Sequence, residues 1–279
     1  MTILAYLCII RISQEGDNHE KNTCCCYPVA RTVHYPVFAQ AQAESGKKSY
    51  VFAANCAWPP LEFVDENGDI VGFEIDLVNE IAKVNDVEIS IVNVAWEGIF
   101  AGLANGAYDA VASGVSVTEE RKATMDFSTP ILVVTQAILA PVSDTELSNT
   151  ASLNNKTVGV QLGTTGHIFL DDFDQSRDDF SVTIKAYDEV GFAIEDMLNG
   201  NLDAVVTDSV IASDFVMTND NYASKLKITG SASDLGEPEP IAIATLKGNS
   251  EVLDLVNNGL KTMEENGTMD ALKEKWGII

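Results

Sequence analysis

The sequence predicts an α/β fold made of two related lobes. A seven-residue phrase with the pattern N-G-x-x-D-A-V occurs twice, at 105–111 and at 199–205. Before each copy, apolar residues recur at the three- and four-residue spacing of one helix face. A glycine just past a helix supplies the left-handed conformation that ends it, and an Ala-Val pair is typical of a short buried strand. Two such units indicate two lobes of the same architecture.

Strands and helices alternate along the rest of the chain. In the first half we expect a strand at 50–54, a hairpin turn at 65–68, a helix through Ile75, Val78 and Ala82, and a strand at 88–94. In the second half we expect strands at 156–160 and 182–186, a helix at 251–265 ended by Gly267, and a short helix to Trp276. Alternation favours parallel sheets, whose ligands bind beyond the carboxyl ends of the strands. The segments that follow the repeated strands, 113–121 and 207–209, are therefore the places to search.

Charge and composition exclude some classes of function. The 279 residues include 17 basic and 42 acidic side chains, a formal net charge of −25. Residues 1–43 hold as many basic as acidic side chains, so the entire net negative charge is carried by residues 44–279. Because phosphates and anionic lipids are bound through Lys and Arg, we expect no nucleic-acid partner. No apolar run is long enough to span a membrane. No spacing supports a metal site, and we expect no metal and no cofactor.

The N-terminal segment differs from the rest of the chain. Four of the five cysteines fall in it, and it contains an A-x-A spacing, ending at Ala43, that is typical of signal-peptidase sites. Its apolar start is short, however, and a polar stretch separates it from the A-x-A. We therefore assign residues 1–48 to an export signal or a disordered segment, with both alternatives open. Cys56 is the one cysteine that follows, so the rest of the chain can form no internal disulfide.

Two charged residues in the segments after the repeated strands match the charged groups of an amino acid. The guanidinium of Arg121 could hold a carboxylate through two parallel hydrogen bonds. The alternative is a surface ion pair with Glu119 or Glu120. Asp208 directly follows an apolar strand and could accept hydrogen bonds from an ammonium, or it could instead cap the following helix.

Two turns and two tryptophans complete the candidate site. The residues are Ser113, Gly114, Ser116, Thr164, Thr165, Trp58 and Trp96. Small residues in the turns leave backbone N–H groups accessible to an anion. The Gly/Thr turn lacks the spacing and the lysine of a phosphate-binding loop, so we do not expect a nucleotide. The tryptophans could form the walls of a pocket or belong to the buried core. Together these groups offer a cation, an anion and aromatic plates, which is the complement of an α-amino acid.

Several phrases match a known family in order and spacing. They are Trp58–Phe63, Gly72–Leu77, Ser113–Arg121, Asp126–Pro130, Gly163–Thr165, and Asn266–Thr268 followed by Lys275–Trp276. With these phrases, residues 49–279 resemble the polar-amino-acid solute-binding proteins of ABC importers along essentially their full length.

The resemblance implies a two-lobed, periplasmic-binding-protein-like α/β fold of type II, with two parallel-rich sheets joined by two crossover strands. Lobe 1 would span 49–135 plus 238–279, and lobe 2 would span 136–237. We expect a periplasmic or otherwise extracytoplasmic monomer that captures an amino acid and delivers it to the membrane permease of an ABC importer. The alternative is an enzyme on the same scaffold, such as a cyclohexadienyl-dehydratase-like protein. The candidate site contains no cluster of His, Cys or Lys to act as a general acid, so we expect no enzyme.

The resemblance also implies roles for the candidate residues. Arg121 would hold the ligand carboxylate and Asp208 the ammonium, the two turns would add hydrogen bonds, and the two tryptophans would sandwich the side chain. Asn55 and Gln161 occupy the positions at which members of this family carry residues that contact the ligand side chain. Their amides carry no charge, so a charged side chain buried against them would lack a counter-ion. We therefore predict a polar, uncharged amino acid in preference to Arg, Lys and Glu.

Overall fold

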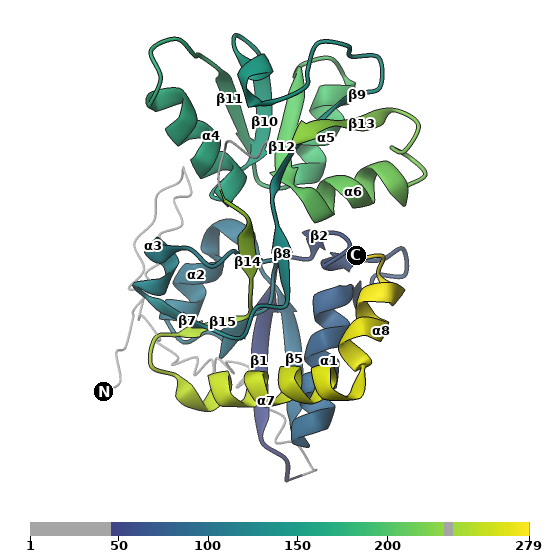
Figure 1. Cartoon of the computed structure of the whole chain (residues 1–279). Helices are drawn as coiled ribbons and strands as arrows, with labels where there is room; N and C mark the ends of the chain where they lie inside the picture. The colour runs from purple at the N-terminus through teal and green to yellow at the C-terminus, as the bar shows by residue number, and fades with distance from the viewer. Residues whose placement is uncertain (1–45, 232–236, 279) are drawn as a thin grey trace, which may run out of the picture. The chain divides into compact units, whose positions relative to one another are not determined.

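The computed structural model describes residues 46–231 and 237–278. Residues 43–279 make up one unit, which is built on two five-stranded sheets (Figure 1). The export or disordered segment predicted at 1–48 lies outside the described residues, except for 46–48, which form no helix or strand. Within the described ranges, no helix combines the length and the apolar character needed to cross a membrane.

The first sheet takes its strands from both ends of this unit. Its order is β5 (Glu88–Asn93), β1 (Ser49–Ala54), β6 (Ala110–Val111), β15 (Ala244–Leu246) and β7 (Met125–Phe127). Strand β1 is parallel to β5 and β6, whereas β15 is antiparallel to β6 and β7.

Helices cover both faces of the first sheet, and successive strand residues, which point to opposite sides, pack against different helices. The helices are α1 (Phe73–Asn85), α2 (Trp96–Ala104), α7 (Ser250–Asn266) and α8 (Thr268–Lys275). Phe52 of β1 belongs to one core cluster with Leu77 of α1 and Val256 of α7. The next residue, Ala53, belongs to another cluster with Ile99 of α2.

The second sheet repeats this plan. Its order is β11 (Thr183–Tyr187), β10 (Thr157–Gln161), β12 (Ala204–Asp208), β9 (Gln136–Pro141) and β13 (Leu226–Ser231). Its helices are α4 (Thr165–Gln175), α5 (Val190–Leu198) and α6 (Ser209–Met217). On β12, Val206 packs with Leu170 of α4, while Val205 shares a core cluster with Ile194 of α5 and Ile211 of α6. The strands and helices that the sequence predicts in both halves form close to their predicted bounds.

Each sheet is mixed rather than uniformly parallel. The predicted parallel pairing holds for β5, β1 and β6 in the first sheet and for β11, β10 and β12 in the second, which are joined through helices. The other strands of the two sheets pair antiparallel. Two antiparallel strands, β8 (Leu132–Val134) and β14 (Glu239–Ile241), run between the sheets (Figure 1). The exact lobe boundaries stay a prediction.

The remaining elements are short. A three-stranded sheet is formed by β2 (Ala57–Trp58), β3 (Glu62–Val64) and β4 (Ile70–Val71). The predicted turn at 65–68 joins the antiparallel strands β3 and β4. The helical turns are α3 (Glu119–Lys122) and η1 (Thr150–Leu153).

The repeated phrase has the same structural role in both sheets. Gly106 and Gly200 follow α2 and α5 with φ angles of 70° and 82°, in the left-handed region that glycine tolerates. The carboxylate of Asp109 accepts a hydrogen bond from the backbone N–H of Val51 at 2.8 Å. In the second copy, Asp203 accepts one from the backbone N–H of Thr157 at 2.7 Å. The repeated aspartate therefore ties each new strand to the start of its neighbour, which explains why both copies carry it.

Candidate ligand-binding site

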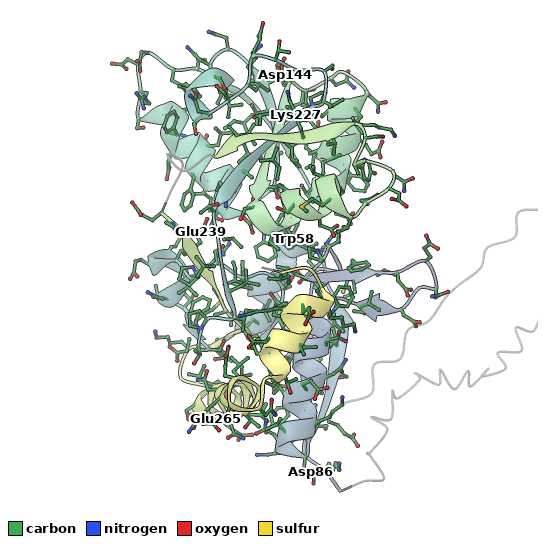
Figure 2. All side chains as sticks on the ribbon, turned by 45° about the vertical axis from the view of Figure 1, so that its right-hand side comes forward. Trp58, Asp86, Asp144, Lys227, Glu239 and Glu265 are labelled. Atoms are coloured by element: carbon green, nitrogen blue, oxygen red, sulfur yellow. The ribbon has the colours of Figure 1, made fainter. Side chains whose placement is uncertain are left out.

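One small cavity lies near the carboxyl ends of strands of both sheets. Its walls are formed by Asn55, Trp58, Glu62, Trp96, Ser113, Gly114, Ser116, Arg121, Gln161, Thr164, Thr165 and Asp208. All of the residues that the sequence singled out are among them, and Glu62 is the addition. Figure 2 shows Trp58 in the region between the two sheets.

Asn55 and Gln161 bring the two sheets into contact inside the cavity. Asn55 directly follows β1, and Gln161 is the last residue of β10. The Gln161 Nε2 atom donates to Asn55 Oδ1 at 3.3 Å, and Asn55 Nδ2 donates to the carbonyl of Val94 at 3.3 Å. Both side chains are buried. The Gln161 Oε1 atom has no partner among the described residues, so it is an acceptor that a ligand N–H group could use.

Arg121 reaches the cavity from the short helix α3. The hydroxyl of Thr118 accepts a hydrogen bond from the Arg121 backbone N–H at 3.1 Å and so caps this helix. The guanidinium donates to the carbonyl of Ser116 at 2.9 Å and lies 5.5 Å from the ring centroid of Trp96. Burial lowers the pKa of Arg121, while the carboxylates of Glu239 and Asp208 oppose this effect. The group stays a cation, because arginine is protonated at any ordinary pH.

The surface ion pair that the sequence left open for Arg121 does not form. Among the described residues, Glu119 pairs with Lys122 at 2.7 Å, and neither Glu119 nor Glu120 forms an ion pair with Arg121. The other arginine of this region, Arg177, lies on the surface near Asp179, with 3.6 Å between its Nε and the carboxylate. Arg121 is thus the arginine that the fold directs into the cavity.

Asp208 occupies the N-cap position of α6, but its side chain does not cap the helix. Its carboxyl Oδ1 instead accepts a hydrogen bond from Gln136 Nε2 at 2.8 Å. The side chain is buried. The pKa of Asp208 is raised to about 7, mainly by burial and to a smaller extent by the nearby carboxylate of Glu239. A cation placed beside this carboxyl would lower that pKa again, so the site favours an ammonium as partner.

The turn after β6 joins the cavity to a buried hydrogen-bond network. The hydroxyl of Ser113 accepts from the backbone N–H of Asn55 at 2.8 Å and donates to Glu62 at 2.9 Å. Gly114 has a φ of +56°, and a Cβ there would lie 3.1 Å from the ring of Trp58, so both the backbone and the packing call for glycine. Across the cavity, the hydroxyls of Ser116 and Thr165 lie 3.5 Å apart.

The sequence left open whether the two tryptophans form walls of a pocket or belong to the buried core, and each of them does both. Both are buried: Trp58 belongs to a core cluster with residues of α1, and Trp96 to one with residues of α2. Both also line the cavity. Trp96 packs edge-on against Phe100, with ring centroids 5.0 Å apart. A ligand would therefore meet ring surfaces that the core holds in place.

Glu62 is the cavity residue that sequence reasoning missed. It is completely buried, one of its oxygens accepts from Ser113, and the other, Oε2, has no partner among the described residues. The pKa of Glu62 is raised well above its usual value, mainly by burial and to a smaller extent by the neighbouring Glu74. In the sequence this residue stands between Leu61 and Phe63 with nothing to mark it, because a glutamate is almost never fully buried. Sequence reasoning also missed Gln136, which donates to Asp208 from the start of β9, and Glu239, which accepts from the same amide at the start of the crossover strand β14.

Two mixed sheets, two connecting strands and a polar cavity beyond the strand ends define a two-lobed binding protein of the periplasmic type. The chain belongs to the bacterial extracellular solute-binding proteins, family 3, whose sequence profile matches residues 50–278. Membership and the curated relatives confirm the predicted class, an amino-acid solute-binding protein of an ABC transporter. The prediction that the chain is not an enzyme is confirmed by relatives that are binding proteins for histidine, cystine and arginine.

Individual relatives agree with this assignment. The chain is 31% identical to a "Probable histidine-binding protein" of Neisseria gonorrhoeae, over 85% of this chain and 86% of that protein. An ancestral arginine-binding protein solved with arginine is 36% identical, with a TM-score of 0.76 over 82% of this chain and 98% of that one. An ancestral arginine-binding protein solved with glutamine is 35% identical, with a TM-score of 0.76 over 84% and 99%.

Proposed function

We propose that the chain captures one free amino acid in the cavity between its two sheets and delivers it to the membrane permease of an ABC importer. The observation that carries this proposal is the presence of Arg121 and Asp208 in the walls of one small cavity. Arg121 presents a guanidinium suited to the α-carboxylate, and Asp208 presents a buried carboxyl suited to the α-ammonium. The hydroxyls of Ser116 and Thr165 stand between the two sheets and add further hydrogen bonds.

The side chain of the ligand is one that donates hydrogen bonds. Two cavity atoms have no partner among the described residues: Gln161 Oε1, which is an acceptor, and Glu62 Oε2, which is an acceptor when the carboxyl group is ionised. A purely aliphatic ligand would leave them unsatisfied, at a cost of about 1–3 kcal/mol each. Amide, imidazole and guanidinium groups can all donate to them. This supports a polar ligand, as the sequence predicted.

The preference for an uncharged ligand needs revision. It depended on the absence of any carboxylate other than Asp208 from the cavity, and that premise is wrong because Glu62 also lines the wall. A guanidinium or imidazolium could ionise Glu62 and gain a counter-ion. We therefore extend the proposal from uncharged amides to cationic side chains. Ancestral arginine-binding proteins solved with arginine and with glutamine show that both kinds of ligand occur among the relatives.

The remaining features of the proposal concern where the protein acts. We infer that it works as a monomer outside the cytoplasm, in the periplasm or at the cell surface, as expected for an extracellular solute-binding family. In this arrangement, 49–135 with 238–279 would form lobe 1 and 136–237 lobe 2. The strands β8 and β14 between the sheets would serve as the hinge.

A thermal-shift screen against the twenty common amino acids, followed by calorimetry, tests the proposal. A ligand at one hundred times its dissociation constant adds about 2.7 kcal/mol of stability and so gives a clear rise in Tm. We expect a shift with at least one amino acid whose side chain carries an N–H donor, and none in the Arg121→Ala variant. If no amino acid stabilises the wild type, the proposal is wrong. If aliphatic ligands bind best, the assignment of the acceptors is wrong.

A further inference from the structure

One amide nitrogen, Gln136 Nε2, connects Asp208, the proposed partner of the ligand ammonium, to Glu239 at the start of the crossover strand β14. Gln136 is the first residue of β9, shortly after β8, and Glu239 is the first residue of β14. The Gln136 Nε2 atom lies 2.8 Å from Asp208 Oδ1, 2.9 Å from Glu239 Oε1 and 3.3 Å from Thr165 Oγ1. Figure 2 shows Glu239, like Trp58, in the region between the two sheets.

This amide has too few hydrogens for its neighbours. Nε2 carries two hydrogens, and the two shortest contacts, to Asp208 and Glu239, use them. All three side chains are at most 5% exposed. The second oxygen of Glu239, Oε2, is buried without a partner in the described part of the chain. Two carboxyl groups therefore share one buried donor group, and two negative charges repel strongly when they are buried.

The other charged groups nearby do not remove this repulsion. Arg121 attracts both Glu239 and Asp208 from the first sheet, but it forms no ion pair with either of them among the described residues. Glu62 is a further acid that interacts electrostatically with Asp208. Burial and Glu239 both raise the pKa of Asp208, whereas the hydrogen bond from Gln136 lowers it.

We propose that Gln136 and Glu239 are positioning residues for Asp208, and that Glu239 keeps Asp208 protonated until the ammonium of a ligand displaces that proton into solvent. The ligand keeps its own three ammonium protons, so the single proton released comes from the carboxyl group. Gln136 holds the carboxyl in place through both states. This inference rests on the proposed function, because it needs an ammonium at Asp208.

The mechanism predicts a pH dependence of binding with a definite sign. Because Asp208 has a raised pKa of about 7, binding an ammonium below that pH must expel a proton, and affinity should rise as the pH increases towards 7. Above pH 7 the carboxylate is already free, and affinity should level off. In the limit of full protonation the dissociation constant should fall about tenfold per pH unit.

Calorimetry in two buffers of different ionisation enthalpy measures the proton release directly. With glutamine, whose side chain is uncharged and does not ionise Glu62, the wild type should release up to about one proton per ligand bound at pH 6. Glu239→Gln removes the like charge and should lower the release. Gln136→Leu removes the bond that favours the ionised form, so the release at pH 7.5 should rise above the wild-type value. Glu264→Gln, an exposed change of the same charge on α7, should leave the release as in the wild type.

Opposite responses of the two variants distinguish this mechanism from a general loss of structure. If Glu239→Gln releases as many protons as the wild type with the same pH profile, the inference is overturned. A wild type that binds an amino acid at pH 6 without releasing a proton also overturns it, whether or not the variants fold. A release that disappears in Glu62→Gln but not in Glu239→Gln would assign the proton to Glu62 instead. If the wild type binds no amino acid at all, the proposed function itself has failed.

Discussion

The side chains of Asn55 and Gln161 meet through a hydrogen bond of 3.3 Å, from Gln161 Nε2 to Asn55 Oδ1. They stand at the carboxyl ends of β1 and β10, and each of these strands has two parallel neighbours in its own sheet. The two halves of the repeat thus bring equivalent strand ends to one point. A ligand that enters there contacts both sheets at once, so binding and the arrangement of the sheets should be coupled.

Removal of the Arg121 guanidinium should abolish tight binding. In our assignment Arg121→Ala leaves a buried ligand carboxylate unpaired, at a cost of about 3–5 kcal/mol. This corresponds to a loss of about a hundredfold to several thousandfold in affinity. Arg121→Lys should also bind poorly, because an ammonium cannot form two parallel bonds to one carboxylate. Calorimetry with the amino acid found in the screen measures both.

The chain offers a matched control for this experiment. Arg177 is exposed and lies beside Phe173 and Asp179, so Arg177→Ala changes the net charge equally without reaching the cavity. It should bind as the wild type does. Affinity within threefold of wild type for Arg121→Ala or Arg121→Lys would show that the carboxylate is held elsewhere.

Glu74 should make the ligand-free protein less stable at high pH. This residue is fully buried, its Oε1 accepts from the backbone N–H of Gly114 at 2.8 Å, and its Oε2 has no partner among the described residues. Burial raises its pKa to about 7. A carboxyl whose folded pKa exceeds its unfolded pKa binds more protons when folded, so stability falls as the pH rises from about 4.5 to 7.

Glu74→Gln should therefore stabilise the protein at pH 8 and have little effect at pH 5. The amide oxygen keeps the bond from Gly114, while the charge near Glu62 disappears. We expect a gain of about 1–3 kcal/mol in the free energy of unfolding at pH 8, measured by urea denaturation without ligand. Glu264→Gln, exposed on α7, should change stability little at either pH. A loss of stability at pH 8 in Glu74→Gln would contradict this account.

Binding should also draw the two sheets together. Arg121 and Ser116 belong to segments that follow the first sheet, whereas Gln161 and Asp208 end strands of the second. A ligand that contacts all of them favours a closed arrangement, and hinge closure of this kind is known for periplasmic binding proteins. Small-angle scattering should show a smaller radius of gyration with ligand than without. Arg121→Ala at the same ligand concentration should show no change, and an unchanged wild-type profile at saturation would count against closure.

The sequence reveals the part of the site that local pattern controls. Arg121 follows the first repeated strand and Asp208 ends the second, and the carboxyl ends of parallel strands are where ligands of α/β sheets bind. The residues it does not reveal reach the cavity through tertiary contacts. Gln136 stands before a run of apolar residues, and its role follows only from the crossover that brings Glu239 to within 2.9 Å of it. Polar side chains of this kind are usually exposed, so neither residue propensity nor hydrophobic periodicity in the sequence indicates that they are buried in the site.

Asn55 offers the sharpest test of ligand choice. An aspartate at this position would place a carboxylate at the contact between Asn55 and Gln161, where the ligand side chain is read. A charge-assisted hydrogen bond to a buried guanidinium is worth about 1.5–3 kcal/mol. We therefore expect Asn55→Asp to shift the ratio of dissociation constants for glutamine and arginine towards arginine by about tenfold to a hundredfold. Competition titrations of both ligands against wild type and variant measure this ratio.

Asn258→Asp separates this local effect from the change in net charge. Asn258 is exposed on α7, so its replacement adds the same charge far from the strand ends, where salt screens it within about 8 Å. In Asn258→Asp, the ratio of the dissociation constants for glutamine and arginine should stay within twofold of the wild-type value. If Asn55→Asp leaves the ratio unchanged, then Asn55 does not contact the ligand side chain, and Glu62 is the acid that decides between cationic and uncharged ligands. If both variants shift the ratio equally, the overall field of the protein sets the preference, and neither residue reads the side chain.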